Sequence, residues 1–512
     1  MRRPGIEPGS LTWEAKIIPL DHQRINIFQK VVFINVFYLF NSMVDGKIIS
    51  KTFDESEYLK HSKEHSIRNS ISEGCSQSAG VNMSSGFLTP FILAIGGNSF
   101  HVGLLTSLGG LADPVGEIAG SKMMEHHSRK KLWMYAKFWI ILLQIPTLLI
   151  IYSYWKGIIT NLLPWFMILL WGLLIPLIYG AGYVSWLSWL GDLVPANRRG
   201  EFFSNRNKIL GIVGLVTFFI AGFVLDLFKT KGYVLLGFAI LFSLAIIFRA
   251  MSIYYNSKMF NPYFRVKKQS YFSFISFLKR YDNYGKFTVF QAVFTFAMML
   301  SAPFFAVYML DDLKFDYTTY TFISLSSTVF YLIFSPFAGK FSDRYGNKKL
   351  IYFGALLFPL VPLLWMMFTN PIALIFIPGI VSGLANAAFA IGTTDFSYDS
   401  TSQEKRGVCF SYSALLMGIG TLLGSSVGGW LVEYLPFTTM KPLFVVFVIS
   451  SIFMFISTLL FLPQIKEQRQ VSKIRGLHLE VNHPVKTIHS FIVWARQLSH
   501  WQPALMGKAG KK

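Results

Sequence analysis

Two carboxylic acids lie one helical turn apart within a largely apolar stretch of the chain. Asp113 and Glu117 are separated by four positions, so a helix over residues 100–121 places both on one face. Ionised side chains are costly inside a bilayer, and two close carboxylates disfavour double ionisation. The pair is therefore a candidate for carrying a proton. The alternative is that these acids form ion pairs with Lys122, Lys137 or another basic group.

Five uncharged polar side chains stand near the middle of long apolar stretches. At that depth a polar group binds either a solute in a cavity or a neighbouring helix, the latter with about 0.6 kcal/mol. The candidates for a solute cavity are Asn82, Gln144, Tyr179, Gln291 and Asn386. We interpret three aromatic residues, Tyr183, Trp186 and Trp189, as packing or interface anchors instead.

Two polar loops, more than two hundred residues apart, are imperfect copies of each other. The first reads SKMMEHHSRKKL over 121–132, and the second reads GKFSDRYGNKKL over 339–350. A second pair of segments shares seven identities in register, and Tyr179 and Asn386 occupy equivalent positions of this repeat. The seven are Asp192, Arg199, Gly200, Phe203, Ser204, Gly211 and Gly222, repeated as Asp399, Arg406, Gly407, Phe410, Ser411, Gly418 and Gly429. The chain is therefore internally duplicated.

The composition indicates an all-α membrane protein. Hydrophobic residues make up 53% of the chain and charged residues 14%, whereas a soluble domain carries about 25% charge. Windows of about nineteen residues predict twelve transmembrane helices in two six-helix pseudo-repeat bundles. These helices cover 73–97, 100–121, 132–154, 163–191, 205–227, 233–255, 287–309, 318–341, 349–369, 372–396, 407–433 and 441–463. The first two are the most polar, as expected of helices that face a wet cavity.

The net charge of +21 reflects where Lys and Arg lie, and we exclude a nucleic-acid partner. Nearly all lie in alternate loops and in the two tails. The opposite loops hold five of 47, namely Lys156, Lys229, Lys231, Lys314 and Lys441. This bias predicts a multi-pass protein of the cell membrane with both termini cytoplasmic, because the helix count is even. Part of the excess also attracts the anionic lipid of the bilayer.

The predicted helices divide the chain into five parts. Residues 1–72 form a cytoplasmic extension, of which 1–42 are expected to be unstructured or foreign to the natural product. The two bundles cover 73–255 and 287–463, a linker at 256–286 joins them, and a basic cytoplasmic tail covers 464–512. The linker and the tail, near 488–498, are each expected to contain a short helix on the membrane surface. Cys75 and Cys409 do not suggest a disulfide framework.

The loop GKFSDRYGNKK resembles the signature of the major facilitator superfamily, which is Gly-x-x-x-Asp-Arg-x-Gly followed by basic residues. Gly339, Asp343, Arg344, Gly346 and Lys348 supply it after the eighth helix. The copy in the first half keeps an acid and a basic run but has lost both glycines. The segment over 186–207 also resembles one found in many poorly characterised prokaryotic members.

The resemblance implies that these loops latch the two halves together on the cytoplasmic side in an outward-facing state. Gly339 would let helices approach closely, and Gly346 would permit a tight turn. Asp343 would pair with a basic group or cap a helix. The other members of this gate are Glu125, Arg129, Asp192, Arg199, Asp399 and Arg406. Alternatively, these charges only set topology and turn geometry.

The sequence predicts a monomeric transporter that moves a small solute by alternating access. We expect a proton or another ion to drive it, because no nucleotide-binding Gly-x-x-x-x-Gly-Lys-Ser/Thr loop occurs. The fourth helix lacks the intramembrane arginine of proton-coupled drug antiporters, and the fifth lacks their Gly-Pro-x-x-Gly-Gly motif. A non-transporting receptor or scaffold is the alternative. An enzyme is disfavoured, since we find no metal cluster, cofactor motif or nucleophile–base pair.

Overall fold

The computed structural model describes residues 55–158, 161–194, 199–262, 273–279, 282–402, 405–434 and 440–468. All of its helices belong to one compact unit, Phe53–Lys512. The expectations for residues 1–42 and for a helix near 488–498 lie outside the described residues.

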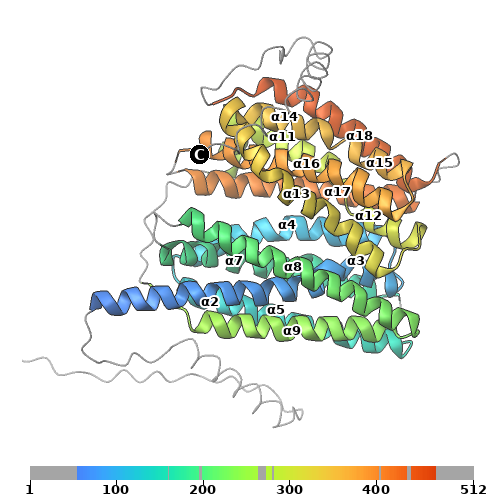
Figure 1. Ribbon diagram of the computed structural model, residues 1–512, viewed down its shortest axis with the longest axis horizontal. Coiled ribbons are helices and arrows are strands. Elements are labelled where there is room, and N and C mark those ends of the chain that lie inside the picture. Colours follow the sequence, from blue (N-terminus) through green and yellow to red (C-terminus); the bar gives the residue numbers. More distant parts are fainter. Residues whose placement is uncertain are drawn as a thin grey trace, which may run out of the picture. The chain divides into compact units, whose positions relative to one another are not determined.

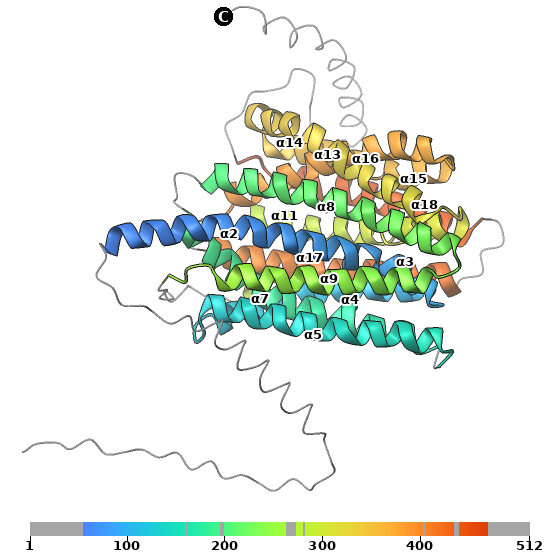
Figure 2. The same cartoon turned by 60° about the horizontal axis from the view of Figure 1, so that its bottom comes forward.

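Six long helical segments, some of them built from consecutive shorter helices, form the first half of the protein (Figure 1); we call each such segment a rod. The first consists of α2 (Glu55–Ser84), a short 3-10 turn (Ser85–Phe87) and α3 (Leu88–Ala94), and the fourth contains a π-helical segment (Ile168–Leu174) between α6 (Leu163–Met167) and α7 (Ile175–Leu193). The others are α4 (Ser99–Met123), α5 (Arg129–Trp155), α8 (Arg199–Thr230) and α9 (Val234–Ser257). Helices α2, α9 and α5 run side by side in both ribbon views (Figure 2).

Six rods also form the second half, after the short linker helix α10 (Phe274–Leu278). Two of them, the seventh and the ninth rods of the chain, are interrupted. The rods are α11 (Asn283–Met299) with α12 (Phe304–Val307) and a π-helical turn (Tyr308–Asp312), α13 (Tyr317–Tyr345), α14 (Asn347–Leu357) with α15 (Leu360–Met367), α16 (Pro371–Asp399), α17 (Arg406–Tyr434) and α18 (Pro442–Phe461).

The predicted all-α fold is confirmed, and one helix boundary was wrong. Ten rods of the described chain are long and apolar enough to cross a membrane; α2–α3 and α4 are not among them, so the count of twelve spans stays a prediction. The first helix begins at Glu55 rather than at 73. Hydropathy missed residues 55–72 because they are polar, although Ser66 and Ser70 are fully buried. The other boundaries differ by at most six residues (205 expected, 199 observed).

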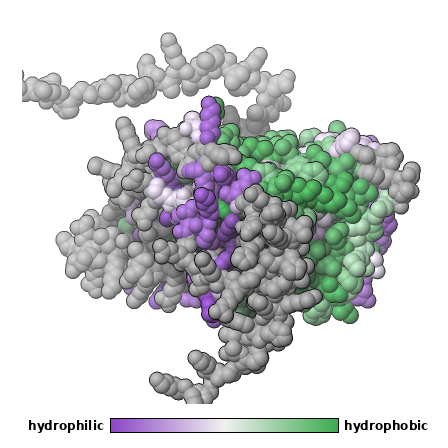
Figure 3. All heavy atoms as spheres, turned by 90° about the horizontal axis from the view of Figure 1, so that it is seen from above, coloured by the Kyte–Doolittle hydropathy of each residue, from purple (hydrophilic) through white to green (hydrophobic). Residues whose placement is uncertain are grey.

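The outer faces of the rods are apolar. Large side chains such as Trp139, Leu149, Phe223, Phe337 and Ile452 are exposed. Figure 3 shows a broad apolar surface, with hydrophilic residues gathered towards one end. An apolar surface of this extent suits lipid tails better than water.

Small residues bring helices into close contact inside each half. A Cβ atom on Gly116 or Gly120 of α4 would come within 2.1 Å or 2.0 Å of a backbone oxygen of α7. In the second half, glycines at every fourth position of α17 face the backbone of α11 in the same way; these are Gly420, Gly424 and Gly428. Such seams are typical of membrane helices, whose association depends on close packing.

The two halves meet mainly at one end of the helices. We call the end that carries the loop after α4 and the turn before α14 the basic end, and the other the far end. The main helix pairs between the described parts of the two halves are α4 with α17, α8 with α13, and α3 and α4 with α12. Gly103 of α4 faces Ser425 and Gly429 of α17, and Phe218 of α8 contacts Tyr320 of α13. These contacts lie in the far half of each helix, and the seam between α4 and α17 continues to about the middle of both, where Gly418 faces Gly110 and Pro114.

Candidate functional site

The repeated loops at the basic end build the same two contacts in both halves. In the first half, Arg129 Nη1 lies 2.7 Å from Asp192 Oδ2 and donates to the carbonyl and hydroxyl oxygens of Ser188 at 3.0 Å. In the second half, Asn347 occupies the position of Arg129 and donates to Asp399 Oδ2 at 2.7 Å. In each half, the third and fourth rods are therefore joined at equivalent positions.

The next residue of each copy forms hydrogen bonds with the end of the sixth rod of its own half. Lys130 Nζ donates to the carbonyl oxygens of Ser257 (2.8 Å) and Met259 (2.9 Å). Lys348 Nζ donates to the carbonyl oxygen of Pro463 at 3.4 Å, and its backbone N–H donates to Glu467. The duplication seen in the sequence is thus a duplication of contacts.

The residues of the expected gate differ in their local geometry and contacts. Gly346 has a φ of +98°, which fits the tight turn that we predicted. Gly339 does not support close helix approach, because a Cβ atom there would meet open space. Arg406 donates to the carbonyl oxygens of Tyr398 and Thr401, within its own half.

Three other members of the gate, Glu125, Asp343 and Arg344, are exposed at the basic end. The side chain of Arg199 lies outside the described residues. The latch between the halves stays a prediction.

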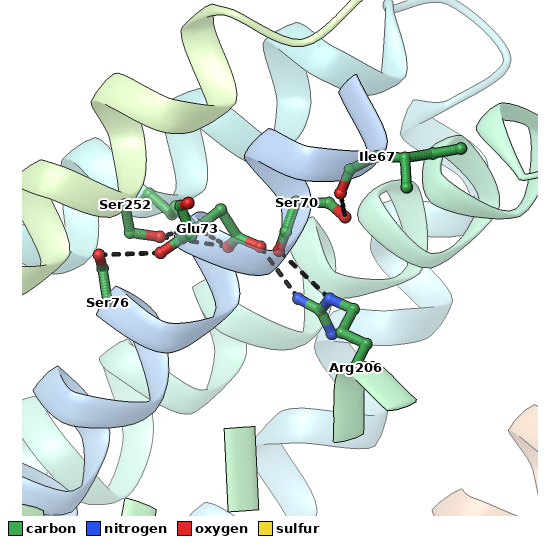
Figure 4. A network of polar contacts seen from close by, with 8 residues as sticks. Ile67, Ser70, Glu73, Ser76, Arg206 and Ser252 are labelled. Atoms are coloured by element: carbon green, nitrogen blue, oxygen red, sulfur yellow. Dashed lines mark hydrogen bonds and ion pairs between the residues drawn. The ribbon is translucent and has the colours of Figure 1, made fainter. Parts of the chain in front are cut away.

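A buried ionic network lies within the first half (Figure 4). Glu73 of α2 is 1% exposed. Its Oε1 accepts from Lys137 Nζ of α5 at 2.5 Å and from Ser252 Oγ of α9 at 3.2 Å. Its Oε2 accepts from Arg206 Nη2 of α8 at 3.1 Å. One carboxylate therefore ties four rods together, and both of its oxygens are occupied.

This network corrects one alternative from the sequence. Lys137 was a possible partner of Asp113 and Glu117, but it pairs with Glu73. A further cation, Arg249 of α9, is buried nearby and donates to Ser84 Oγ at 3.5 Å. Every buried charged side chain of the described residues lies in the first half.

A cavity of about 330 Å³ opens beside this network. It is lined by residues of α2, α5, α7 and α8, all in the first half. The lining residues are Glu73, Gly74, Gln77, Ser78, Val81, Asn82, Trp133, Tyr179, Tyr183, Trp186, Leu187, Phe203, Arg206, Asn207 and Leu210. Its volume is in the range of sites for small molecules.

One wall of the cavity is an aromatic stack. The ring centroids of Tyr179 and Tyr183 are 5.5 Å apart and those of Tyr183 and Trp186 are 5.7 Å apart, with interplanar angles of 17° and 20°. Trp133 meets Tyr179 edge to face at 5.8 Å. Tyr183 and Trp186, which we had interpreted as anchors, thus line the cavity. Trp189 is buried and donates to a backbone carbonyl.

Two of the five candidate cavity residues, Asn82 and Tyr179, line this cavity. Gln144 is buried in α5, where both polar atoms of its amide lack a partner among the described residues. The remaining two lie in the second half. Gln291 is buried in α11, and Asn386 donates to the carbonyl oxygen of Ser382 at 2.9 Å.

Asp113 and Glu117 lie next to the aromatic stack but outside the cavity lining. The tight seam between α4 and α7 places both carboxylates close enough to Tyr183 to interact with its hydroxyl group electrostatically. Asp113 Oδ1 is buried without a hydrogen-bond partner in the described part of the chain. No ion pair of the described residues engages Glu117.

Comparisons with known proteins found similarity in sequence and in fold. The model of the Major Facilitator Superfamily matches residues 287–505. Multidrug resistance protein 2 of Bacillus subtilis (strain 168) is 28% identical over 173 residues, which are 32% of this chain and 42% of that protein. The aligned segment thus spans less than half of this relative's length.

Two solved structures share the fold over both halves. A nucleoside transporter is 17% identical with a TM-score of 0.55, and the match covers 79% of this chain and 99% of that one. A bacterial homologue of the iron transporter ferroportin, in an inward-facing state, is 14% identical with a TM-score of 0.56, covering 77% and 97% of the two chains.

The duplicated rods and their repeated loops define a helical membrane protein built from two similar halves. The sequence match covers the second half, and the structural matches cover both. The second half of the chain, over residues 287–505, matches the model of the Major Facilitator Superfamily, as the loop over 339–349 indicated.

Proposed function

We propose that this protein is a secondary transporter that moves a small solute across the cell membrane by alternating access. The supporting observation is that the described contacts between the halves run from the far end to about the middle of α4 and α17, and lie in the far half of α8 and α13. If the basic end is cytoplasmic, as its charge indicates, this is an inward-open state with both termini in the cytoplasm. The cavity would then receive solute from the cytoplasmic side.

The relatives support transport without naming the solute. One is called a multidrug resistance protein, and one structural neighbour is a nucleoside transporter. Solute-dependent flux in proteoliposomes tests the proposal, after a thermal-shift screen for compounds that stabilise the folded state. Specific binding without flux of any bound compound would instead indicate a receptor or scaffold.

The coupling ion in this proposal is a proton carried by Asp113 and Glu117. We expect Asp113→Asn or Glu117→Gln to abolish accumulation against a gradient but to spare exchange of solute. Exchange needs only reorientation with solute bound, whereas accumulation also needs proton release and an empty return. Both reactions are measured in proteoliposomes with an imposed pH gradient. Variants that still concentrate solute would remove the pair from the coupling mechanism.

The loop after α13 carries a second prediction. Asp343→Asn is expected to leave membrane insertion intact but to lower the transport rate severalfold, because the outward-facing latch loses an anion. The matched change Glu125→Gln should have the smaller effect, since its loop lacks both glycines of the signature. Initial rates are normalised to the amount of protein in the membrane. Equal rates for Asp343→Asn and the parent protein would contradict the latch.

A further inference from the structure

The charged groups in the wall of the cavity favour one kind of ligand. Only Glu73 and Arg206 among the lining residues are charged. Both oxygens of Glu73 already accept hydrogen bonds from Lys137, Ser252 and Arg206, so this acid has little capacity for a cationic ligand. The cavity therefore offers no unoccupied carboxylate among its described lining residues.

Arg206, in contrast, has N–H groups that form no hydrogen bond with the described residues. Its Nε donates to the carbonyl oxygen of Ser70 at 3.2 Å and its Nη2 to Glu73. Its Nη1 makes no hydrogen bond with any residue that the structure describes. Gly74 leaves room for the guanidinium group, since a Cβ atom there would lie 2.5 Å from Nη2. A planar guanidinium group with open N–H groups is well suited to bind a carboxylate.

The balance of buried charges around Glu73 also favours an anionic ligand. Two buried cations, Lys137 and Arg206, contact the one buried acid, Glu73, and a third buried cation, Arg249, is close enough to Lys137 to interact with it electrostatically. Buried charges are stable when they are paired. A ligand with a negative charge would improve this balance, and a cation would worsen it.

The aromatic wall selects for shape. Tyr179, Tyr183 and Trp186 form a nearly parallel stack, and the guanidinium carbon of Arg206 lies 4.8 Å from the ring centre of Trp186. A planar ring can pack against such a wall, and aromatic pairs of this kind contribute more than the burial of their area alone. The amide oxygen of Gln77 is buried in the wall without a partner among the described residues, so it can accept a bond from a ring N–H.

We infer that this cavity binds a planar aromatic solute that carries a carboxylate, with the carboxylate on Arg206 and the ring against Tyr183 and Trp186. This inference rests on the proposed function, since it names the class of solute for the same cavity. It concerns binding in the inward-open state and can be tested without transport.

The test compares three probes that share one ring and differ in charge. Indole-3-acetate, indole and tryptamine are titrated into the purified full chain in detergent, and dissociation constants are measured by calorimetry. We expect indole-3-acetate to bind at least about tenfold more tightly than the other two, because only its carboxylate can form charge-assisted hydrogen bonds with the guanidinium group of Arg206. Tighter binding of tryptamine, equal binding of all three, or no binding would overturn the inference.

Variants locate the site. Arg206→Gln should remove the preference for indole-3-acetate over indole, and Arg206→Lys should keep part of it. Tyr183→Leu should weaken indole-3-acetate and indole alike. Lys208→Gln is the matched control, because Lys208 is exposed on α8 outside the lining. If Lys208→Gln changed the preference as much as Arg206→Gln, the effect would be general electrostatics and the inference would fail.

The proposed function has a separate outcome. Flux of another solute by a protein that binds none of the three probes would overturn the inference and leave transport intact. Selective binding of indole-3-acetate without flux of any bound compound would support the inference and count against transport.

Discussion

Replacing Glu73 by glutamine is expected to lower the free energy of unfolding by about 3–5 kcal/mol, because it leaves two buried cations without their anion. Lys137 and Arg206 are 3% and 5% exposed, and both contact the same carboxylate. Since Glu73 joins α2 to α5, α8 and α9, the loss should destabilise the first half as a whole. Thermal unfolding of the purified protein in detergent measures the change.

A second substitution separates charge from packing. Glu73→Gln combined with Lys137→Met should recover part of the lost stability, because one of the two unpaired cations is removed. The control is Glu64→Gln, which removes an exposed acid from the same helix. A Glu73→Gln variant as stable as the Glu64→Gln variant would show that the buried network contributes little.

The sequence predicted the arrangement of helices well because lipid imposes a simple rule. A rod that faces hydrocarbon must be apolar for about 20 residues, and hydropathy detects such a run directly. The rule fails for α2, which is surrounded by other rods and can hold Ser66, Ser70 and Glu73 on buried faces. Hydropathy therefore assigned the polar first part of α2 to the cytoplasmic extension.

The contacts at the basic end were also predictable, because duplication supplies two examples of each. Arg129 with Asp192 and Asn347 with Asp399 occupy equivalent positions of the repeat. The two cationic partners of Glu73 had no such signal in the sequence. Lys137 and Arg206 are 64 and 133 residues away, and Lys137 follows the basic run of a loop. The available clue was that several single charges in apolar helices of one half require partners.

Replacing Asp226 by asparagine is expected to shift the protein away from the state in which the far ends of the two halves are in contact, towards one in which their basic ends approach each other. Asp226 of α8 accepts hydrogen bonds from the backbone N–H groups of Tyr317 (2.8 Å) and Thr318 (2.6 Å) at the start of α13. A carboxylate from one half thus caps a helix of the other half, where the helix dipole favours an anion. An amide has one acceptor oxygen and no charge. If the substitution weakened this contact by about 1.4 kcal/mol of free energy, the ratio of the two states would change about tenfold.

Spin labels at the basic end report this ratio. Lys122→Cys and Lys340→Cys, made in a Cys75→Ser, Cys409→Ser background, place labels at equivalent exposed positions of α4 and α13. We expect Asp226→Asn to raise the population with the shorter distance between labels. Asp316→Asn is the matched control, because Asp316 caps the same helix from within its own half through Thr319. If both substitutions shift the distances equally, the start of α13 controls the equilibrium. If only Asp226→Asn does, the bond between the halves holds the far end closed.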